Sequence, residues 1–234
     1  MQHLHLAAER GHANHGWLQT HYSFSFADYY NPDKMGVSVL RVINDDRIMP
    51  GTGFGAHPHR DMEIITYMLE GEIEHRDSMG NRTRLKAGEV QVMSAGSGVT
   101  HSEHNPSQTT PLELLQIWIQ PDRRNYRPRY AQQDFSANQG LNLIVASDAE
   151  ASAAALPIRQ DVRVYQLRLA QGTLSLPLQP QRLYYLHIAR GELQVQGHQL
   201  QHGDALELQQ PTPLEVSTRK GVDALLFELP VLRA

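Results

Sequence analysis

The chain consists of short runs in which apolar and polar residues alternate or β-branched residues dominate, each ended by Gly, Pro, Asn or Asp. A period of two is typical of strands, whereas amphipathic helices repeat at about 3.6 residues. The clearest runs of the first half are residues 37–43, 63–69, 83–85, 90–93 and 114–119. The sequence therefore predicts an all-β fold, and the turn-forming cluster at residues 77–81 predicts a hairpin.

The second half shows the same residue pattern, with further strand-like runs at residues 162–169, 183–188, 192–195, 205–208 and 224–229. Two glycine positions also recur in the same order: Gly71 and Gly88 are echoed by Gly191 and Gly203. Such echoes predict a duplicated barrel. The segment 130–156 is rich in Ala, Gln, Ser, Asn and Asp and contains one convincing strand, 141–145. We therefore expect two domains, residues 1–135 and 136–234; residues 149–155 form either a short helix or a loop.

Composition excludes several classes of site. The 234 residues include no cysteine, so disulfides, thiolate catalysis, iron–sulfur clusters and cysteine-type zinc sites are excluded. A net charge of −4 gives no electrostatic reason to bind nucleic acid or an anionic membrane. The first residues lack the apolar core of a signal peptide and the length of a membrane helix. We expect a cytoplasmic monomer that contacts neither membrane nor nucleic acid directly.

Two pairs of metal-ligand residues stand at strand spacing. Residues two apart on a strand point to the same face, so His57 can act with His59, and His101 with Glu103. Three imidazoles and one carboxylate suit one divalent first-row metal ion and leave coordination positions open. A lone His-x-His would be a surface feature in a chain with 13 histidines, but the second pair, after a hairpin, favours a metal site. Open coordination positions indicate chemistry or sensing.

The same region resembles a known family. Gly51-x5-His57-x-His59-x3-Glu63 and Gly98-x2-His101-x3-Asn105 are similar to the two cupin motifs. The sequences HPHR at 57–60, MSAGSGVTHSE at 93–103 and QIW at 116–118 resemble pirin and the bacterial pirin-like quercetinases. The segments FSFADYY at 24–30 and LRVINDD at 40–46 add to the match. The resemblance is strong over residues 10–130 and faint beyond them.

This resemblance implies a fold of two tandem cupin barrels, each a double-stranded β-helix or jelly roll. It also implies one metal in the N-terminal barrel, bound by His57, His59, His101 and Glu103, the residues that strand parity selects. Parity does not exclude Glu63, which the pirin pattern leaves out of the ligand set.

The C-terminal barrel is expected to lack metal ligands. Arg182, Leu183 and Tyr184 occupy the place where a cupin would have its His-x-His pair. The remaining histidines of this half are irregularly spaced, which is typical of surface or core positions.

Other residues near the motifs carry lesser predictions. Phe54 and Gln116 are candidate substrate-binding residues; simple core packing is the alternative for Phe54, whereas an inward amide needs a polar partner. Gln116 and Trp118 share parity, so both should face the same way. His75 has no partner at ligand spacing and is expected to be a satisfied barrel histidine. His104 has the opposite parity from His101 and is expected at the surface.

Two functions fit these residues. The first, implied by the resemblance, is a metal-dependent dioxygenase that opens the heterocycle of a flavonol such as quercetin with O2, with Glu103 as ligand and catalytic proton acceptor. The second is a non-enzymatic, metal-dependent and redox-responsive binding module, the role of pirin as a transcription cofactor. Mixed histidine and carboxylate ligation with open positions favours Fe(II), while Mn, Co, Ni, Cu and Zn remain alternatives.

Overall fold

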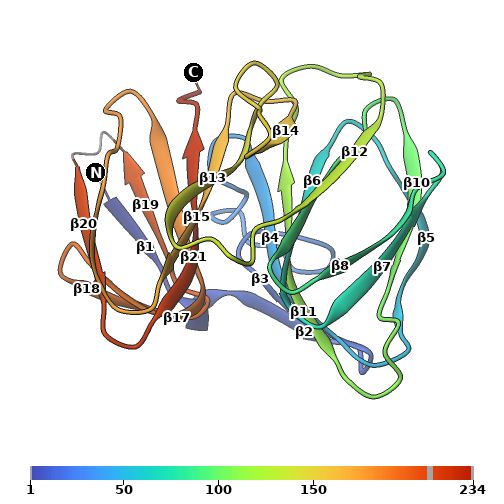
Figure 1. Ribbon diagram of the computed structural model, residues 1–234, viewed down its shortest axis with the longest axis horizontal. Coiled ribbons are helices and arrows are strands. Elements are labelled where there is room, and N and C mark those ends of the chain that lie inside the picture. The colour runs from blue at the N-terminus through green and yellow to red at the C-terminus, as the bar shows by residue number, and fades with distance from the viewer. Residues whose placement is uncertain (1, 210–212, 233–234) are drawn as a thin grey trace. The chain divides into compact units, whose positions relative to one another are not determined.

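The computed structural model describes residues 2–209 and 213–232, and within them it consists of strands β1 to β21 and one short 3-10 helix, η1 (Ala7–Glu9). The prediction of an all-β fold is confirmed (Figure 1). Within the described residues, no helix has the length and hydropathy needed to span a bilayer.

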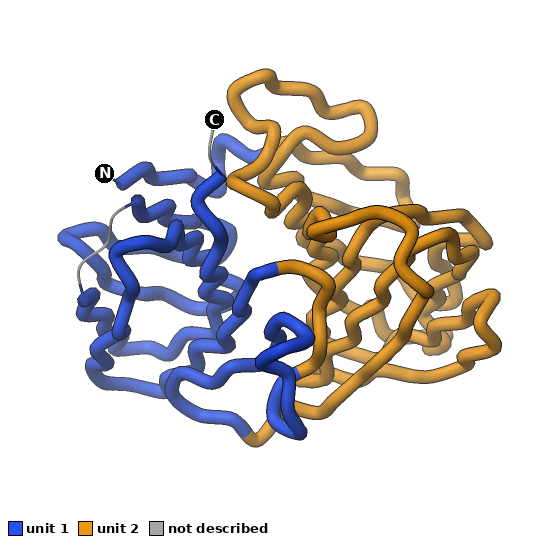
Figure 2. The backbone as a smooth tube through the Cα atoms, turned by 90° about the horizontal axis from the view of Figure 1, so that it is seen from above, with its two compact units in different colours: residues 1–10, 138–155, 161–234 blue, residues 11–137, 156–160 orange. Residues whose placement is uncertain are grey.

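The chain divides into two compact units (Figure 2). Unit 2 comprises residues 11–137 and 156–160, and unit 1 comprises residues 1–10, 138–155 and 161–234. Unit 1 is mainly C-terminal but includes the first ten residues. Unit 2 is mainly N-terminal but includes the short segment 156–160.

Unit 2 contains two antiparallel sheets. The larger has the order β12-β9-β6-β11-β4-β3-β2 and the smaller the order β5-β10-β7-β8. The strands of the larger sheet are β2 (Gly11–Asn14), β3 (Leu18–Tyr22), β4 (Leu40–Ile48), β6 (Glu63–Glu70), β9 (Glu89–Ser94), β11 (Leu112–Ile119) and β12 (Arg129–Asp134). Those of the smaller sheet are β5 (Gly53–His59), β7 (Glu72–Asp77), β8 (Arg82–Lys86) and β10 (Val99–His104). The short strand β14 (Leu156–Ile158) completes the unit.

Two local features of unit 2 place the site. Strand β10 alternates between buried and more exposed residues, so that His101 and Glu103 are buried and His104 is exposed. The hairpin predicted at 77–81 joins β7 to β8 and is held by the Asp77 side chain, which accepts hydrogen bonds from the backbone N–H groups of Met79 and Asn81.

The run predicted at 37–43 begins as a strand only at Leu40, because Ser38 has a left-handed backbone (φ 54°) that cannot continue a strand.

Unit 1 holds a sheet with the order β1-β19-β17-β21-β15-β13, together with β16, β18 and β20. Its strands are β1 (Gln2–His5), β13 (Gly140–Ser147), β15 (Arg163–Leu169), β16 (Gly172–Leu176), β17 (Leu183–Val195), β18 (His198–Gln201), β19 (Ala205–Gln209), β20 (Leu214–Thr218) and β21 (Val222–Leu229). The core of this unit is rich in leucine and valine.

Two expectations for unit 1 are resolved by the structure. Residues 183–188 and 192–195 are parts of the single strand β17, which contains a register shift between Ile188 and Arg190 and therefore bends instead of ending. Gly191 follows the shift with φ +77°, and a Cβ there would lie 2.1 Å from the Gly221 carbonyl oxygen. Residues 149–155 form turns and an isolated bridge, so the loop alternative is correct.

Candidate metal site

Three histidine rings meet where β5 and β10 run side by side. His101 is paired with His57 in the antiparallel register, and Val99 with His59. The ring centroids of His57 and His101 are 4.4 Å apart, those of His59 and His101 4.9 Å, and those of His57 and His59 4.8 Å. One ring nitrogen from each histidine lies within 4.8 Å of the others. The strand parity that predicted this cluster thus brings three of the four predicted ligands together.

The protonation of these rings suits metal binding. Burial and the nearby charge of His57 lower the pKa of His59 to about 4, and burial followed by the charges of His57 and His59 lowers the pKa of His101 to about 3. The His59 and His101 rings are therefore neutral at pH 7, as a metal ligand must be. The His57 Nδ1 lies 2.8 Å from the Gly55 carbonyl oxygen, which fixes its tautomer with a proton on Nδ1 and frees Nε2.

His101 provides the test of whether the residues fit a metal. Its side chain is 2% exposed, and both ring nitrogens are buried without a hydrogen-bond partner. A buried polar atom without a partner costs about 1–3 kcal/mol, so native structures avoid it. A cation between the three rings would satisfy one of these nitrogens, and the donor set therefore fits a divalent transition metal.

The fourth predicted ligand, Glu103, is fully buried and held by neutral groups from the larger sheet. Gln116 Nε2 donates to its Oε2 at 2.9 Å, Gln91 Nε2 donates to its Oε1 at 3.1 Å, and the Thr66 hydroxyl lies 3.4 Å from Oε1. Burial raises the pKa of Glu103 to about 7, although these hydrogen bonds act in the opposite direction. Its carboxylate forms a second group within 4.8 Å with His75 and His101, and this group shares His101 with the group of three histidines.

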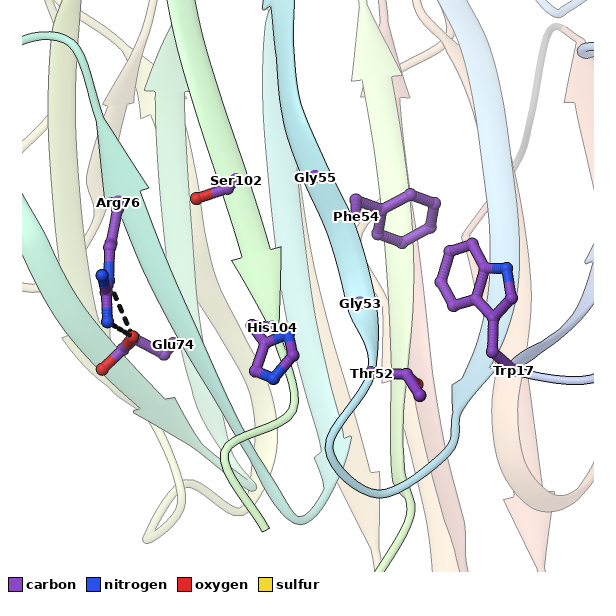
Figure 3. A pocket seen from close by; sticks show the side chains of 9 residues that line it. All are labelled: Trp17, Thr52, Gly53, Phe54, Gly55, Glu74, Arg76, Ser102 and His104. Carbon is purple, nitrogen blue, oxygen red and sulfur yellow. Dashed lines mark hydrogen bonds and ion pairs between the residues drawn. The ribbon is translucent and has the colours of Figure 1, made fainter. Parts of the chain in front are cut away.

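The other acidic and histidine candidates lie elsewhere. Glu63, which the pirin pattern left out of the ligand set, accepts hydrogen bonds from the Ser94 hydroxyl at 2.7 Å and the Arg159 backbone N–H at 3.1 Å. His104 points to the opposite face of the small sheet. There it lines a cavity of about 490 Å³ whose other walls include Trp17 and the hydrogen-bonded pair Glu74–Arg76 (Figure 3).

The two predicted substrate-binding residues occupy different positions. Phe54 lines the cavity of Figure 3 and packs edge-on against Trp17, with ring centroids 5.1 Å apart; its ring is also 6.2 Å from that of His57. Gln116 points inward and is bonded to Glu103. Trp118, on the same face of β11 as Gln116, packs its ring edge-on against His59 at 5.0 Å.

Sequence reasoning missed several residues of this site. Gln91 and Thr66 come from β9 and β6 and reach Glu103 by packing of one sheet on the other. His75 does have a partner: its Nε2 lies 3.0 Å from Oδ2 of Asp77, and both side chains are fully buried. The two stand two residues apart on β7, so the same parity rule that selected His57 and His59 could have found the pair.

Comparison with known proteins identifies the family. Residues 4–119 match the family model Pirin, and residues 143–229 match the model of the quercetinase C-terminal cupin domain. A protein of Escherichia coli (strain K12) named quercetin 2,3-dioxygenase is 45% identical over 231 residues, which cover 98% of this chain and 99% of that protein. The chain belongs to the pirin family.

Solved structures agree with this membership. The crystal structure of the bacterial pirin YhhW from Escherichia coli in complex with nickel(II) matches with a TM-score of 0.94 and 44% identity, over 99% of this chain and 100% of that one. A relative in Pasteurella multocida, 46% identical over 95% of this chain and 97% of its own length, is named a putative quercetin 2,3-dioxygenase. The predicted resemblance and the fold of two cupin barrels are thereby confirmed. Among the residues that the structure describes, both groups able to hold a cation lie in unit 2.

Proposed function

We propose that this pirin is a metal-dependent dioxygenase that opens the heterocycle of a flavonol such as quercetin with O2. The observation that carries the proposal is the cluster of His57, His59 and His101 with the buried carboxylate of Glu103 beside it, in a chain whose relatives are named quercetin 2,3-dioxygenase. These four residues are the proposed ligands, and Fe(II) is the proposed ion because histidine and carboxylate donors with open positions are typical of non-haem iron.

The chemistry that a bound ion would supply is Lewis acidity toward the hydroxyl and carbonyl oxygens of the substrate. The chain supplies orientation and a proton acceptor. We assign the proton of the flavonol hydroxyl to the Glu103 carboxylate, because a carboxylate can accept a proton while neutral imidazoles are needed for binding.

Two amides fix the direction of that base. Gln91 and Gln116 hold opposite oxygens of Glu103, so the carboxylate cannot rotate without breaking a hydrogen bond to a charged acceptor. Such bonds contribute about 1.5–3 kcal/mol each. On the substrate side we propose Phe54, whose ring approaches His57, and Gln116, which acts through Glu103.

The direct test is oxygen uptake with quercetin under air. Metal-free protein is reconstituted in turn with Fe(II), Mn(II), Co(II), Ni(II), Cu(II) or Zn(II), and oxygen consumption is measured with flavonol absorbance. We expect turnover with at least one ion and none in the metal-free protein or in metal-treated His101→Ala. Absence of turnover with every ion on every flavonol tested would refute the enzyme and leave the non-enzymatic binding module.

The role of Glu103 is tested by Glu103→Gln, which keeps size and one oxygen but removes the charge and the basic site. If Glu103 acts as base, turnover at full metal occupancy falls by about 10²–10⁴-fold. Substrate affinity is measured alongside, since a change of ligand charge alters Lewis acidity. A fully metallated variant with wild-type turnover would exclude the base role.

A further inference from the structure

The barrel of unit 2 contains a second group of potential ligands deeper than the three histidines. One ring nitrogen of His75, one of His101 and one carboxylate oxygen of Glu103 lie within 4.8 Å of one another. The three side chains are buried, with His75 0%, His101 2% and Glu103 1% exposed. His57 and His59 are half-buried, so the two groups differ in solvent access.

His75 is oriented as a metal-binding histidine would be. Its Nε2 lies 3.0 Å from Asp77 Oδ2. Asp77 is itself held by the backbone and side-chain N–H groups of Asn81 and the backbone N–H of Met79. Asp77 accepts all of these N–H groups as a carboxylate does, so the proton between the two side chains belongs to His75 Nε2.

This tautomer leaves the lone pair of His75 on Nδ1. That atom is buried and has no hydrogen-bond partner. A histidine that donates one N–H to a carboxylate and presents its other nitrogen to an ion is the usual arrangement around protein-bound metals.

Glu103 also retains capacity for a cation. A carboxylate has about four acceptor positions, and the contacts with Gln91, Thr66 and Gln116 use at most three. The amides could stay in place during ligation, since metal-bound carboxylates are commonly hydrogen-bonded as well.

We propose that the barrel has an inner divalent-cation position formed by His75 Nδ1, His101 and Glu103, in addition to the outer position formed by His57, His59 and His101 with Glu103 as the proposed fourth ligand. The inference rests on the metal assignment of the proposed function for His101 and Glu103 and adds His75 to it. Two histidines and one carboxylate are the donor set of many non-haem Fe(II) sites, whereas three histidines also suit zinc, copper and nickel.

The two positions share His101, so they hold one ion per chain between them. The two positions give Glu103 different roles. An ion at the outer position has three histidine ligands, so the Glu103 carboxylate can leave it to act as a base, whereas an ion at the inner position has only two histidines and needs the carboxylate as a ligand. The position of the ion thus decides the role of Glu103.

The test is metal binding by variants of the full chain, with Co(II) as the probe. The wild type is expected to bind one Co(II) per chain, measured by elemental analysis after gel filtration. The double variant His57→Ala/His59→Ala removes the outer position and is expected to retain Co(II) with a weaker Kd. Adding His75→Gln to the double variant should weaken Co(II) binding at least tenfold, and adding Asp77→Asn instead should weaken it by about 10–100-fold.

Two controls keep the result interpretable. His104→Ala in the double variant removes an exposed histidine from the other face of the same strand and should change nothing. Circular dichroism and the melting temperature of each metal-free variant exclude loss of the fold as the cause. A folded double variant that binds no Co(II), or one whose binding is unchanged by His75→Gln, would overturn the inner position.

Flavonol turnover plays no part in these measurements. A wild type without turnover whose Co(II) binding follows this pattern would refute the dioxygenase and keep the inner position. Flavonol turnover by a protein whose Co(II) binding depends only on His57, His59, His101 and Glu103 would support the dioxygenase and refute the inner position.

Discussion

Glu103 imposes a measurable cost on the metal-free protein. It is a fully buried carboxylate whose hydrogen-bond partners are two amides and one hydroxyl, all neutral. Burial raises its pKa from 4.5 to about 7. Between these values the folded state holds a proton that the unfolded state has lost, so the free energy of unfolding falls as pH rises through this range.

The size of the effect follows from the two pKa values. At about 1.4 kcal/mol for each pH unit, a difference of about 2.5 in pKa gives about 3 kcal/mol, of which about 1 kcal/mol is already present at pH 5. Glu103→Gln removes the ionisation while keeping size. The amide of the variant must also rearrange one of the hydrogen bonds from Gln91 and Gln116, a cost that does not depend on pH. We therefore expect the stability of the metal-free variant relative to the wild type to rise by about 2 kcal/mol from pH 5 to pH 8, which for a chain of this length corresponds to about 4–8 °C in Tm.

The assay is thermal unfolding of chelator-treated protein, followed by circular dichroism at pH 5, 6, 7 and 8. The quantity to compare is the Tm of the variant minus that of the wild type, because the buried histidines add their own pH dependence to both proteins. Their pKa values are lowered, so they weaken the fold as pH falls below about 6.5.

Glu63→Gln is the matched control. Burial also raises the pKa of Glu63 to about 7, but its partners are Ser94 and the backbone of Arg159. It should show a similar stabilisation at pH 8 and unaltered metal retention, whereas Glu103→Gln should lose metal affinity. A Tm difference for Glu103→Gln that is the same at pH 5 and pH 8 would show that the carboxylate is not held in the protonated form.

Three further predictions concern the same site. Gly53→Ala should destabilise the protein and impair metal binding, since the added Cβ would lie 2.2 Å from the Glu103 carbonyl oxygen; urea unfolding and metal analysis check this. Metal affinity should fall as pH drops below about 7, because a proton competes with the ion for Glu103, and should fall further near pH 4, where protons begin to compete for His59; equilibrium dialysis over pH 4–8 that shows constant affinity would contradict ligation by these residues. Chelation should lower the Tm of the whole chain, and return of stoichiometric metal should restore it, because an ion that binds only the folded state stabilises it by mass action.

Strand parity explains how much of this site could be predicted from the sequence. His57 and His59, and His101 and Glu103, are each two residues apart, and the spacing alone predicts a shared face within each pair. Strand β10 pairs with β5 so that His101 lies opposite His57, and this pairing brings the three histidine rings together. The hairpin at Asp77 was likewise predicted from local turn chemistry.

Contacts between sheets could not be predicted in the same way. Gln91 and Thr66 lie on strands whose distance from Glu103 depends on how the two sheets of unit 2 face each other, and no local period encodes that. The continuity of β17 was missed for a related reason. Gly191 at positive φ normally marks a turn, but here the register shift lets the strand continue past it.

The two buried acids of the small sheet differ in how much a cation would stabilise them. Asp77 receives N–H groups from Asn81, Met79 and His75, and is ionised without an ion. Glu103 faces amides that satisfy its oxygens but bring no positive charge, so its ionised form is disfavoured. A divalent ion beside it would supply the missing charge and reverse that preference. Metal binding and the ionisation of Glu103 are therefore coupled. The ionised carboxylate destabilises the metal-free fold at neutral pH, and a bound ion would stabilise that ionised form.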